Sequence, residues 1–359
     1  MLKSWTPAEV KSHTWYRKTL DKCKSSNGKP FSITLKKGTI NKLLVNFAGG
    51  GLSWNDETAA RPLTSLRSIL KIQEGFYISD MPNMLLGLMH VGILSANDIR
   101  NPFFDWHIIN IPYTTADFHI GNSEQVYHAL NGGNKTLYHH GYKNVESAVA
   151  ILKDFFPGTP ESLLIMGESA GAFGCVVHCR AIKKIYADCE NIIVYSEGSH
   201  IRSALWPQIV NDVWKVSPDL SAYIKSDDLI FDLFRYARDN MPPKTLFLHS
   251  NSVWDMELSA FMNKMNYGRK LVNSRILQEF HNTLIETVTK LKKEIPNYSF
   301  YLTDHGQKKD NSTPHIFVGT PKLFYDKMQD NLSIADWLVQ AVEKNAVDIG
   351  EKFIYEQNS

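Results

Sequence analysis

The chain has 359 residues, a formal net charge of +2 and 43% hydrophobic residues, a composition ordinary for a globular protein. This length is enough to bury a sizeable core, and the near-neutral charge gives no indication of nucleic-acid binding. No apolar stretch approaches the roughly 20 residues that a membrane span requires.

Short apolar runs bounded by turn residues predict the strands of one sheet. In chain order they are residues 31–35, 42–47, 106–111, 163–166, 191–195, 245–248 and 298–302. Most runs are continuous, which is typical of strands that are covered on both faces. Helical patterns at 145–155, 172–182 and 276–291 alternate with them. The sequence therefore predicts an α/β protein with a mostly parallel central sheet flanked by helices.

The stretch from about residue 203 to 243 shows no strand pattern and is rich in Trp, Phe and Leu. We expect a helical insertion near the active site, and two interpretations remain open for it. It is either a cap over the site or an ordinary pair of crossover helices. With this insertion included, residues 1–359 are expected to form a single domain.

A Gly-x-Ser-x-Gly pattern at residues 167–171 stands between a predicted strand and a predicted helix. This is the context of a nucleophile elbow, in which the serine is exposed on a sharp turn at the sheet edge. The small flanking residues allow the turn, and the N-terminus of the following helix favours negative charge nearby. The pattern predicts Ser169 as the nucleophile of a serine hydrolase with an α/β-hydrolase-like fold.

In that fold an acid and then a histidine follow the nucleophile along the chain. Asp255 ends the predicted loop 249–255, which comes directly after the predicted strand 245–248. Glu257 lies two residues further on and is an alternative acid. Three more acids, within the helical insertion, also compete: Asp227, Asp228 and Asp232.

Two histidines, His305 and His315, follow the last predicted strand. A neutral serine requires a general base, so one of the two is expected to serve. Position along the chain leaves the choice between them open.

An oxyanion hole requires backbone N–H groups near the attacked carbonyl. One is expected from Ala170, the residue after the nucleophile, and others from a glycine-rich turn after an early strand. The glycine triplet 49–51 directly follows the predicted strand 42–47. We therefore predict Gly50, Gly51 and Ala170 as the donors.

The four cysteines show no pattern that requires a disulfide, which fits a reducing compartment. Cys175, His178 and Cys179 have a spacing open to metal ligation, but buried residues of a packed helix explain them better. A serine mechanism needs neither a metal nor an organic cofactor. The first residues show no apolar segment of a secretory signal, so we expect a cytoplasmic protein, with secretion as the alternative.

Motifs along almost the whole chain resemble those of the pectin acetylesterase / Notum family of carboxylesterases, especially its bacterial members. The matching segments are 23–31, 47–54, 112–121, 139–144, 167–171 and 253–257. The resemblance implies an α/β-hydrolase fold, a Ser-His-Asp triad and ester hydrolysis, and it assigns the triad acid to Asp255. It also favours His315, because Phe324-Tyr325 and Ala335-Asp336-Trp337 follow it as in bacterial members. His305 remains the alternative base, since His305-Gly306-Gln307 resembles the plant members.

The chain departs from the family at informative positions. Ser53 and Thr114 stand where the family often has cysteines, as if a disulfide had been lost. Glu168 replaces the cysteine that is common before the nucleophile in plant members. These departures put secretion and a pectin substrate in question.

We therefore predict a serine carboxylesterase, a deacetylase of small-molecule or carbohydrate esters with short acyl chains. Thioesterase or acyltransferase activity, including lipid deacylation, is the alternative within the same chemistry. A non-catalytic binding protein on the same fold is the alternative from another class, and the sequence does not indicate the oligomeric state. For Asp117 and His119 a hydrogen-bonded structural loop is preferred to a metal site or a second acid–base pair. Candidate substrate contacts are Leu52, Trp54, Asp117, His119 and Glu168.

Overall fold

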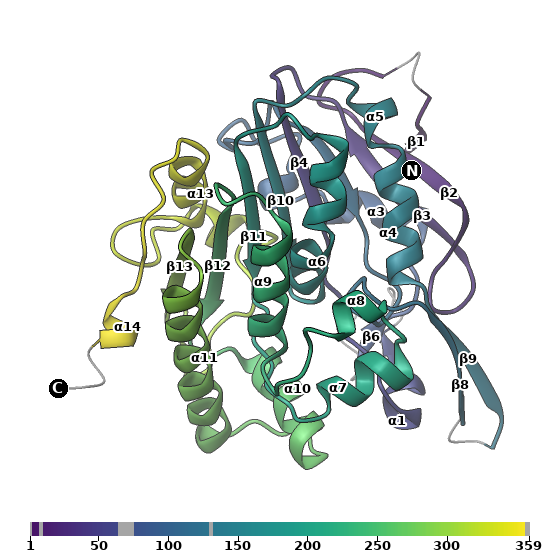
Figure 1. Cartoon of the computed structure of the whole chain (residues 1–359), viewed down its shortest axis with the longest axis vertical. Helices are drawn as coiled ribbons and strands as arrows, with labels where there is room; N and C mark the ends of the chain where they lie inside the picture. The colour runs from purple at the N-terminus through teal and green to yellow at the C-terminus, as the bar shows by residue number, and fades with distance from the viewer. Residues whose placement is uncertain (1, 7–9, 64–74, 129–131, 356–359) are drawn as a thin grey trace.

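The computed structural model describes residues 2–6, 10–63, 75–128 and 132–355. Its centre is a nine-stranded sheet in the order β1-β2-β3-β7-β4-β10-β11-β12-β13 (Figure 1). The strands are β1 (Lys3–Ser4), β2 (Trp15–Lys24), β3 (Pro30–Lys36), β4 (Lys42–Phe47), β7 (His107–Ile111), β10 (Ser162–Glu168), β11 (Ile192–Glu197), β12 (Leu246–Ser252) and β13 (Tyr298–Thr303).

The sheet is mostly parallel, as the sequence predicts. The run from β7 through β4, β10, β11 and β12 to β13 pairs in parallel throughout. Only β3 is antiparallel to its neighbours, β2 and β7. The carboxyl ends of the parallel strands therefore share one edge, which is where open α/β sheets place their sites.

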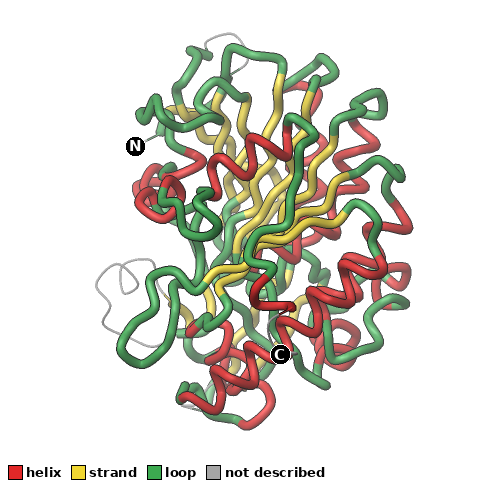
Figure 2. The backbone as a smooth tube through the Cα atoms, turned by 90° about the vertical axis from the view of Figure 1, so that its left-hand side faces the viewer, coloured by secondary structure: helices red, strands yellow, loops and turns green. Residues whose placement is uncertain are grey.

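Helices cover both faces of the sheet (Figure 2). Alternate strand residues supply the two cores. On β10, Leu163 and Ile165 face one core, and Leu164 and Met166 face the other. The first core is covered by α4 (Gly141–Ala150), α6 (Ala170–Ile185), α9 (Leu229–Asn240) and α11 (Ser274–Glu294), and the second by α12 (Pro321–Tyr325) and α13 (Ile334–Val342). Burial on both faces explains the continuous apolar runs of these strands.

The remaining elements are short or peripheral. The antiparallel hairpin of β8 (Ser123–His128) and β9 (Asn134–His139) extends away from the body of the molecule (Figure 1). The others are α1 (Asp56–Ala59), β5 (Pro62–Leu63), β6 (Tyr77–Ile78), α3 (Asn83–Leu86), η2 (Gly87–Met89), η3 (Gly92–Leu94), α5 (Leu152–Phe155), α10 (Met256–Tyr267) and α14 (Lys352–Tyr355). Among the described helices, none is long and apolar enough to cross a bilayer.

The predicted insertion 203–243, all of which is described, contains helices and no strand. These are α7 (Trp206–Gln208), the π-helical turn η4 (Ile209–Val213), α8 (Pro218–Ser221) and α9. Helix α9 packs against α6 and α11, as a crossover helix does. Before it, the fully buried Trp214 donates its indole N–H to the carbonyl of Ser53 at 2.9 Å, close to the glycine triplet. The segment therefore combines a crossover helix with a part that is attached to the loop after β4.

Candidate active site

The three predicted triad residues follow three strands at the same edge of the sheet. Ser169 comes directly after β10, Asp255 follows β12 at the start of α10, and His315 lies in the loop after β13. Strand β11 separates β10 from β12, and β13 lies beyond β12. Residues far apart in the sequence are thus brought to one edge by the parallel arrangement.

Ser169 has the backbone of a nucleophile elbow, with φ 54° and ψ −124°. This is a strained conformation for a residue with a side chain, and such strain collects at functional sites. The turn is possible because glycines flank it closely. A Cβ on Gly167 would lie 2.2 Å from the carbonyl oxygen of Gly171, and one on Gly171 would lie 1.9 Å from that of Phe47.

His315 and Asp255 form a hydrogen-bonded acid–base pair. The Nδ1 of His315 donates to Oδ2 of Asp255 at 2.6 Å. The other carboxylate oxygen, Oδ1, accepts the backbone N–H of Leu258 at 2.9 Å and caps α10. Because both oxygens have a partner and Asp255 is fully buried, its orientation is well determined. This fixes the tautomer that leaves Nε2 of His315 free to accept a proton.

The loop that carries His315 is attached to the end of β12 through Thr313. The backbone N–H of Thr313 donates to the carbonyl of Trp254 at 3.0 Å, and its hydroxyl oxygen accepts the N–H of Trp254 at 3.2 Å. The hydroxyl of Ser252 also bonds to that of Thr313. The loop that carries His315 is therefore held beside the segment that leads into Asp255.

Burial alone would lower the pKa of His315. The Asp255 carboxylate, through its charge and its hydrogen bond, outweighs this and raises the pKa of His315 overall, with smaller contributions from Glu257 and Glu197. A stabilised imidazolium is what a histidine needs in order to take a proton from a serine.

Ser169 and His315 flank the same short segment, residues 197–198. The N–H of Ser169 donates to the carbonyl of Glu197 at 2.8 Å. The position of a Cβ on Gly198 lies 3.1 Å from Cε1 of His315. The hydroxyl of Ser169 forms no hydrogen bond with any described residue. Catalytic hydrogen bonds often form fully only when a substrate is bound.

The alternative base and acid lie in other environments. His305 is about one third exposed, and its Nε2 lies 3.6 Å from Oδ2 of Asp326. Glu257 is on the first turn of α10, where it acts on His315 only through its charge. Asp228 caps α9 and accepts a hydrogen bond from the hydroxyl of Thr287.

The glycine triplet after β4 lies against the nucleophile. A Cβ on Gly49 would lie 2.6 Å from Cβ of Ser169. The N–H of Gly49 is taken by the Glu168 carboxyl at 3.3 Å. In contrast, the N–H groups of Gly50, Gly51 and Ala170 have no acceptor among the residues that the structure describes. These are the three groups that the sequence predicts as oxyanion donors.

The other predicted substrate contacts are buried. Leu52 and Trp54 are 1% and 7% exposed, and Trp54 packs edge-on against Phe76. Asp117 accepts hydrogen bonds from the hydroxyl of Thr115 and from two backbone N–H groups, and burial raises its pKa to about 6. His119 donates from Nε2 to the carbonyl of Ala48 at 3.0 Å. These bonds favour a structural role for the 117–119 segment, in which it supports the glycine loop.

Sequence reasoning missed Glu197, which the structure places beside the site. Its carboxyl accepts the backbone N–H groups of Phe317 and Val318, just after His315. The available signal was that the buried runs of β10 and β11 each end in a glutamate, Glu168 and Glu197, at matching positions. A carboxyl at the end of a buried strand needs a partner in a neighbouring loop.

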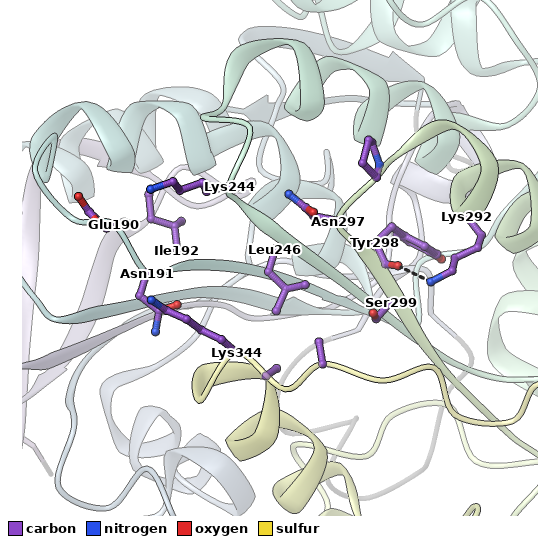
Figure 3. A pocket seen from close by; sticks show the side chains of 13 residues that line it. Glu190, Asn191, Ile192, Lys244, Leu246, Lys292, Asn297, Tyr298, Ser299 and Lys344 are labelled. Atoms are coloured by element: carbon purple, nitrogen blue, oxygen red, sulfur yellow. Dashed lines mark hydrogen bonds between the residues drawn. The ribbon is translucent and has the colours of Figure 1, made fainter.

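A cavity of about 510 Å³ lies at the opposite end of the strands (Figure 3). It is at the amino ends of β11, β12 and β13, near Ile192, Leu246 and Tyr298. Lys292 beside it is already paired with the Tyr298 carbonyl and with Asp348. Since a strand of seven residues such as β12 spans about 23 Å, this cavity is not part of the site around Ser169.

The three residues considered as alternative metal ligands on α6 form hydrogen bonds with backbone carbonyl groups instead. The thiols of Cys175 and Cys179 bond to the carbonyls of Ala172 and Val176, and Nε2 of His178 donates to the carbonyl of His119. The described residues contain no cluster of three or more His, Cys, Asp or Glu side chains arranged to hold a metal ion.

Comparison with known proteins bears on this arrangement. The sequence profile described as Pectinacetylesterase matches residues 22–201, which is half of the chain and includes the glycine triplet and the elbow. The chain belongs to the pectinacetylesterase family. Since this is a family of carboxylesterases, the chain is a carboxylic ester hydrolase.

The fold of this pectinacetylesterase family member is similar to two crystal forms of the Wnt deacylase Notum from Drosophila. The TM-scores are 0.62 and 0.61 at 14% sequence identity. The alignments cover 92% and 93% of this chain and 94% and 95% of the Notum chains. At this identity the similarity concerns the α/β-hydrolase fold. No curated protein matches the sequence.

Proposed function

We propose that the protein is a serine carboxylesterase that hydrolyses short-chain acyl esters, O-acetyl esters above all, through an acyl-enzyme on Ser169. The observation that carries this proposal is the hydrogen-bonded pair of Asp255 and His315 at the sheet edge where Ser169 forms a strained elbow. The acetyl preference is supported by membership of a family whose description names an acetyl ester.

The proposed reaction has two steps. The Oγ of Ser169 attacks the ester carbonyl carbon while Nε2 of His315 takes its proton. The resulting oxyanion accepts hydrogen bonds from the N–H groups of Gly50, Gly51 and Ala170, which have no other acceptor among the described residues. His315 then gives its proton to the departing alcohol.

Water attacks the acyl-enzyme in the second step, again with His315 as the base. The acid product leaves and Ser169 recovers its proton. Throughout, Asp255 holds the Nδ1–H of His315 and stabilises the imidazolium. Each step uses only groups of the chain, the ester and water.

A second candidate is an acyltransferase or thioesterase, including a deacylase of longer acyl groups. It shares the acyl-enzyme and differs only in the acceptor or the acyl chain. It is supported by the similarity of fold to a protein described as a Wnt deacylase. Fold similarity cannot choose between them, because specificity resides in the site.

A panel of p-nitrophenyl esters with acyl chains of two to twelve carbons would test the substrate proposal. We expect kcat/KM to fall sharply beyond about four carbons, because a small acyl pocket excludes longer chains. A pocket for long chains would instead raise kcat/KM steadily with chain length, because each buried CH₂ contributes ~0.8 kcal/mol of binding free energy. Faster turnover of octanoyl than of acetyl esters would replace the short-chain proposal by the deacylase alternative.

We further propose a reducing location, the cytoplasm, with secretion as the alternative. The four cysteines, Cys23, Cys175, Cys179 and Cys189, are all buried free thiols. A strong reductant should therefore change Tm by less than about 2 °C, since the stabilisation that a disulfide provides is absent. A fall of more than about 4 °C on reduction, measured by scanning calorimetry, would indicate a disulfide and favour export.

A further inference from the structure

Two glutamates lie side by side beneath the nucleophile. Glu168 on β10 and Glu197 on β11 are register partners in the parallel sheet, at the carboxyl ends of both strands. Glu168 immediately precedes Ser169, and the carbonyl of Glu197 accepts the N–H of Ser169. Glu197 is fully buried, and so is the Oε2 atom of Glu168.

Each carboxyl is bonded to a different catalytic loop. Glu197 accepts the N–H of Phe317 at 2.8 Å and that of Val318 at 3.3 Å, two and three residues after His315. Glu168 accepts the N–H of Gly49 at 3.3 Å, directly before the proposed oxyanion donors. The pair therefore connects the nucleophile strand to the histidine loop on one side and to the glycine loop on the other.

The hydrogen bonds also indicate which carboxyl holds a proton. Two adjacent buried carboxylates repel each other, so that one of them is expected to be neutral. Glu197 accepts two backbone N–H groups. Glu168 accepts one, that of Gly49, and its Oε2 has no hydrogen-bond partner among the residues that the structure describes. An unpartnered buried oxygen is far less costly in a neutral acid than in an anion. The proton is therefore expected on Glu168.

Neighbouring groups support this distribution. Burial, and then the charge of Glu197, raise the pKa of Glu168 to about 8. Burial raises the pKa of Glu197 only to about 7, because the N–H groups of Phe317 and Val318 stabilise its anion. Glu168 also faces the neutral side chain of Asn46 on β4 and the buried thiol of Cys175 on α6. Glu197 faces Tyr195 on its own strand and His315 in the loop after β13. His315 is the cationic group of this set when it is protonated, and it acts on Glu197.

We propose that Glu168 and Glu197 are positioning residues of the esterase. Neutral Glu168 holds the glycine loop, and anionic Glu197 holds the histidine loop, so that both loops are in register with Ser169. This inference rests on the proposed function and adds the residues that position its catalytic loops. Neither carboxyl needs to touch the substrate.

Ionisation of Glu168 would disrupt this arrangement. Above its pKa a second negative charge would stand beside Glu197 and under the donors that must stabilise an oxyanion. Since like charge near a developing anion destabilises the transition state, kcat should fall as pH rises through about 8. Since this decline in kcat is caused by ionisation of Glu168, replacing Glu168 with a neutral isostere should abolish the decline.

The test compares pH–rate profiles of the wild type and of Glu168→Gln, Glu197→Gln and the control Glu190→Gln, an exposed glutamate before β11. Glu168→Gln should lose the alkaline decline, because its amide cannot ionise. Glu197→Gln should lower kcat about tenfold or more with little change in KM, and should shift the acid limb of His315 to lower pH. Glu190→Gln should behave as the wild type.

Unfolding curves of each variant would show that these changes occur in folded protein. An unchanged alkaline decline in Glu168→Gln, or an unchanged acid limb in Glu197→Gln, would overturn the inference. Fluorophosphonate labelling of the wild type keeps the two proposals apart. If the wild type is labelled on Ser169 and these profiles do not differ, only the positioning roles fail. If Ser169 is not labelled, the proposed function itself fails.

Discussion

Replacement of Ser169 with alanine is expected to lower kcat for an activated acetyl ester by about 10⁴-fold or more, with a small change in KM. The reason is that Ser169 supplies the hydroxyl of the elbow, and this hydroxyl forms no hydrogen bond with any described residue. The residual rate would come from binding and from the oxyanion donors alone. Steady-state kinetics with p-nitrophenyl acetate measure the effect.

The same variant should no longer react with a fluorophosphonate probe, whereas the wild type should carry one label on the peptide that contains Ser169. Ser274→Ala, a change at an exposed serine on α11, is the matched control and should keep both rate and labelling. Labelling that persists in Ser169→Ala would show that the nucleophile is elsewhere.

The second large effect is expected for the base. His315→Ala should lower kcat by about 10³-fold or more, because Ser169 then has no group to take its proton and Asp255 is left buried without its partner. His305→Ala is the natural control. That histidine is partly exposed and lies beside Asp326, so its removal should leave most of the activity.

The two histidine variants together decide which histidine acts as the base. A large loss in His305→Ala with little loss in His315→Ala would transfer the role of base to His305. Similar moderate losses in both would exclude either assignment. Thermal unfolding of both variants should be measured together with the kinetics, because a buried Asp255 without its partner also destabilises the fold.

Much of the sheet follows from the sequence because its strands are buried on both faces. A continuous apolar run such as 42–47 has few alternatives to a core strand, and β4 has these bounds in the structure. Strand β2 was missed because it lies near the sheet edge and mixes buried Trp15 and Leu20 with several charged residues. The hairpin β8–β9 was missed for the same reason, since most of its side chains are at least partly exposed.

The boundaries near the site were harder to predict than the elements. The segment 249–255 was expected to be a loop, yet His249 to Ser252 continue β12. The polar residues there are buried in bonds with Tyr298, Tyr195 and Thr313, partners that only the tertiary structure supplies. A polar segment is predicted as a loop because the sequence does not show the hydrogen-bond partners of its side chains. Where tertiary structure supplies those partners, the same segment can form a buried strand.

Within the site, the motif was sufficient to propose Ser169 and chain order indicated Asp255, whereas the family resemblance favoured His315 over His305. The structure brings Asp255 and His315 into contact. The pairing of Glu168 with Glu197 could not be derived in this way. It depends on which strands are neighbours and in what register, and those relations come from tertiary packing.

The dual bonding of Asp255 has a consequence for reading variation among relatives of this chain. One carboxylate oxygen caps α10 and the other binds His315, so a single side chain serves both folding and the proposed chemistry. Loss of a helix cap alone costs ~1 kcal/mol, which is enough for purifying selection to act on. An aspartate retained at this position is therefore weak evidence of activity, because an inactive descendant would keep it in order to fold. His315 caps no helix that the structure describes, so a substitution of His315 in a relative would be clearer evidence that this relative has lost the activity.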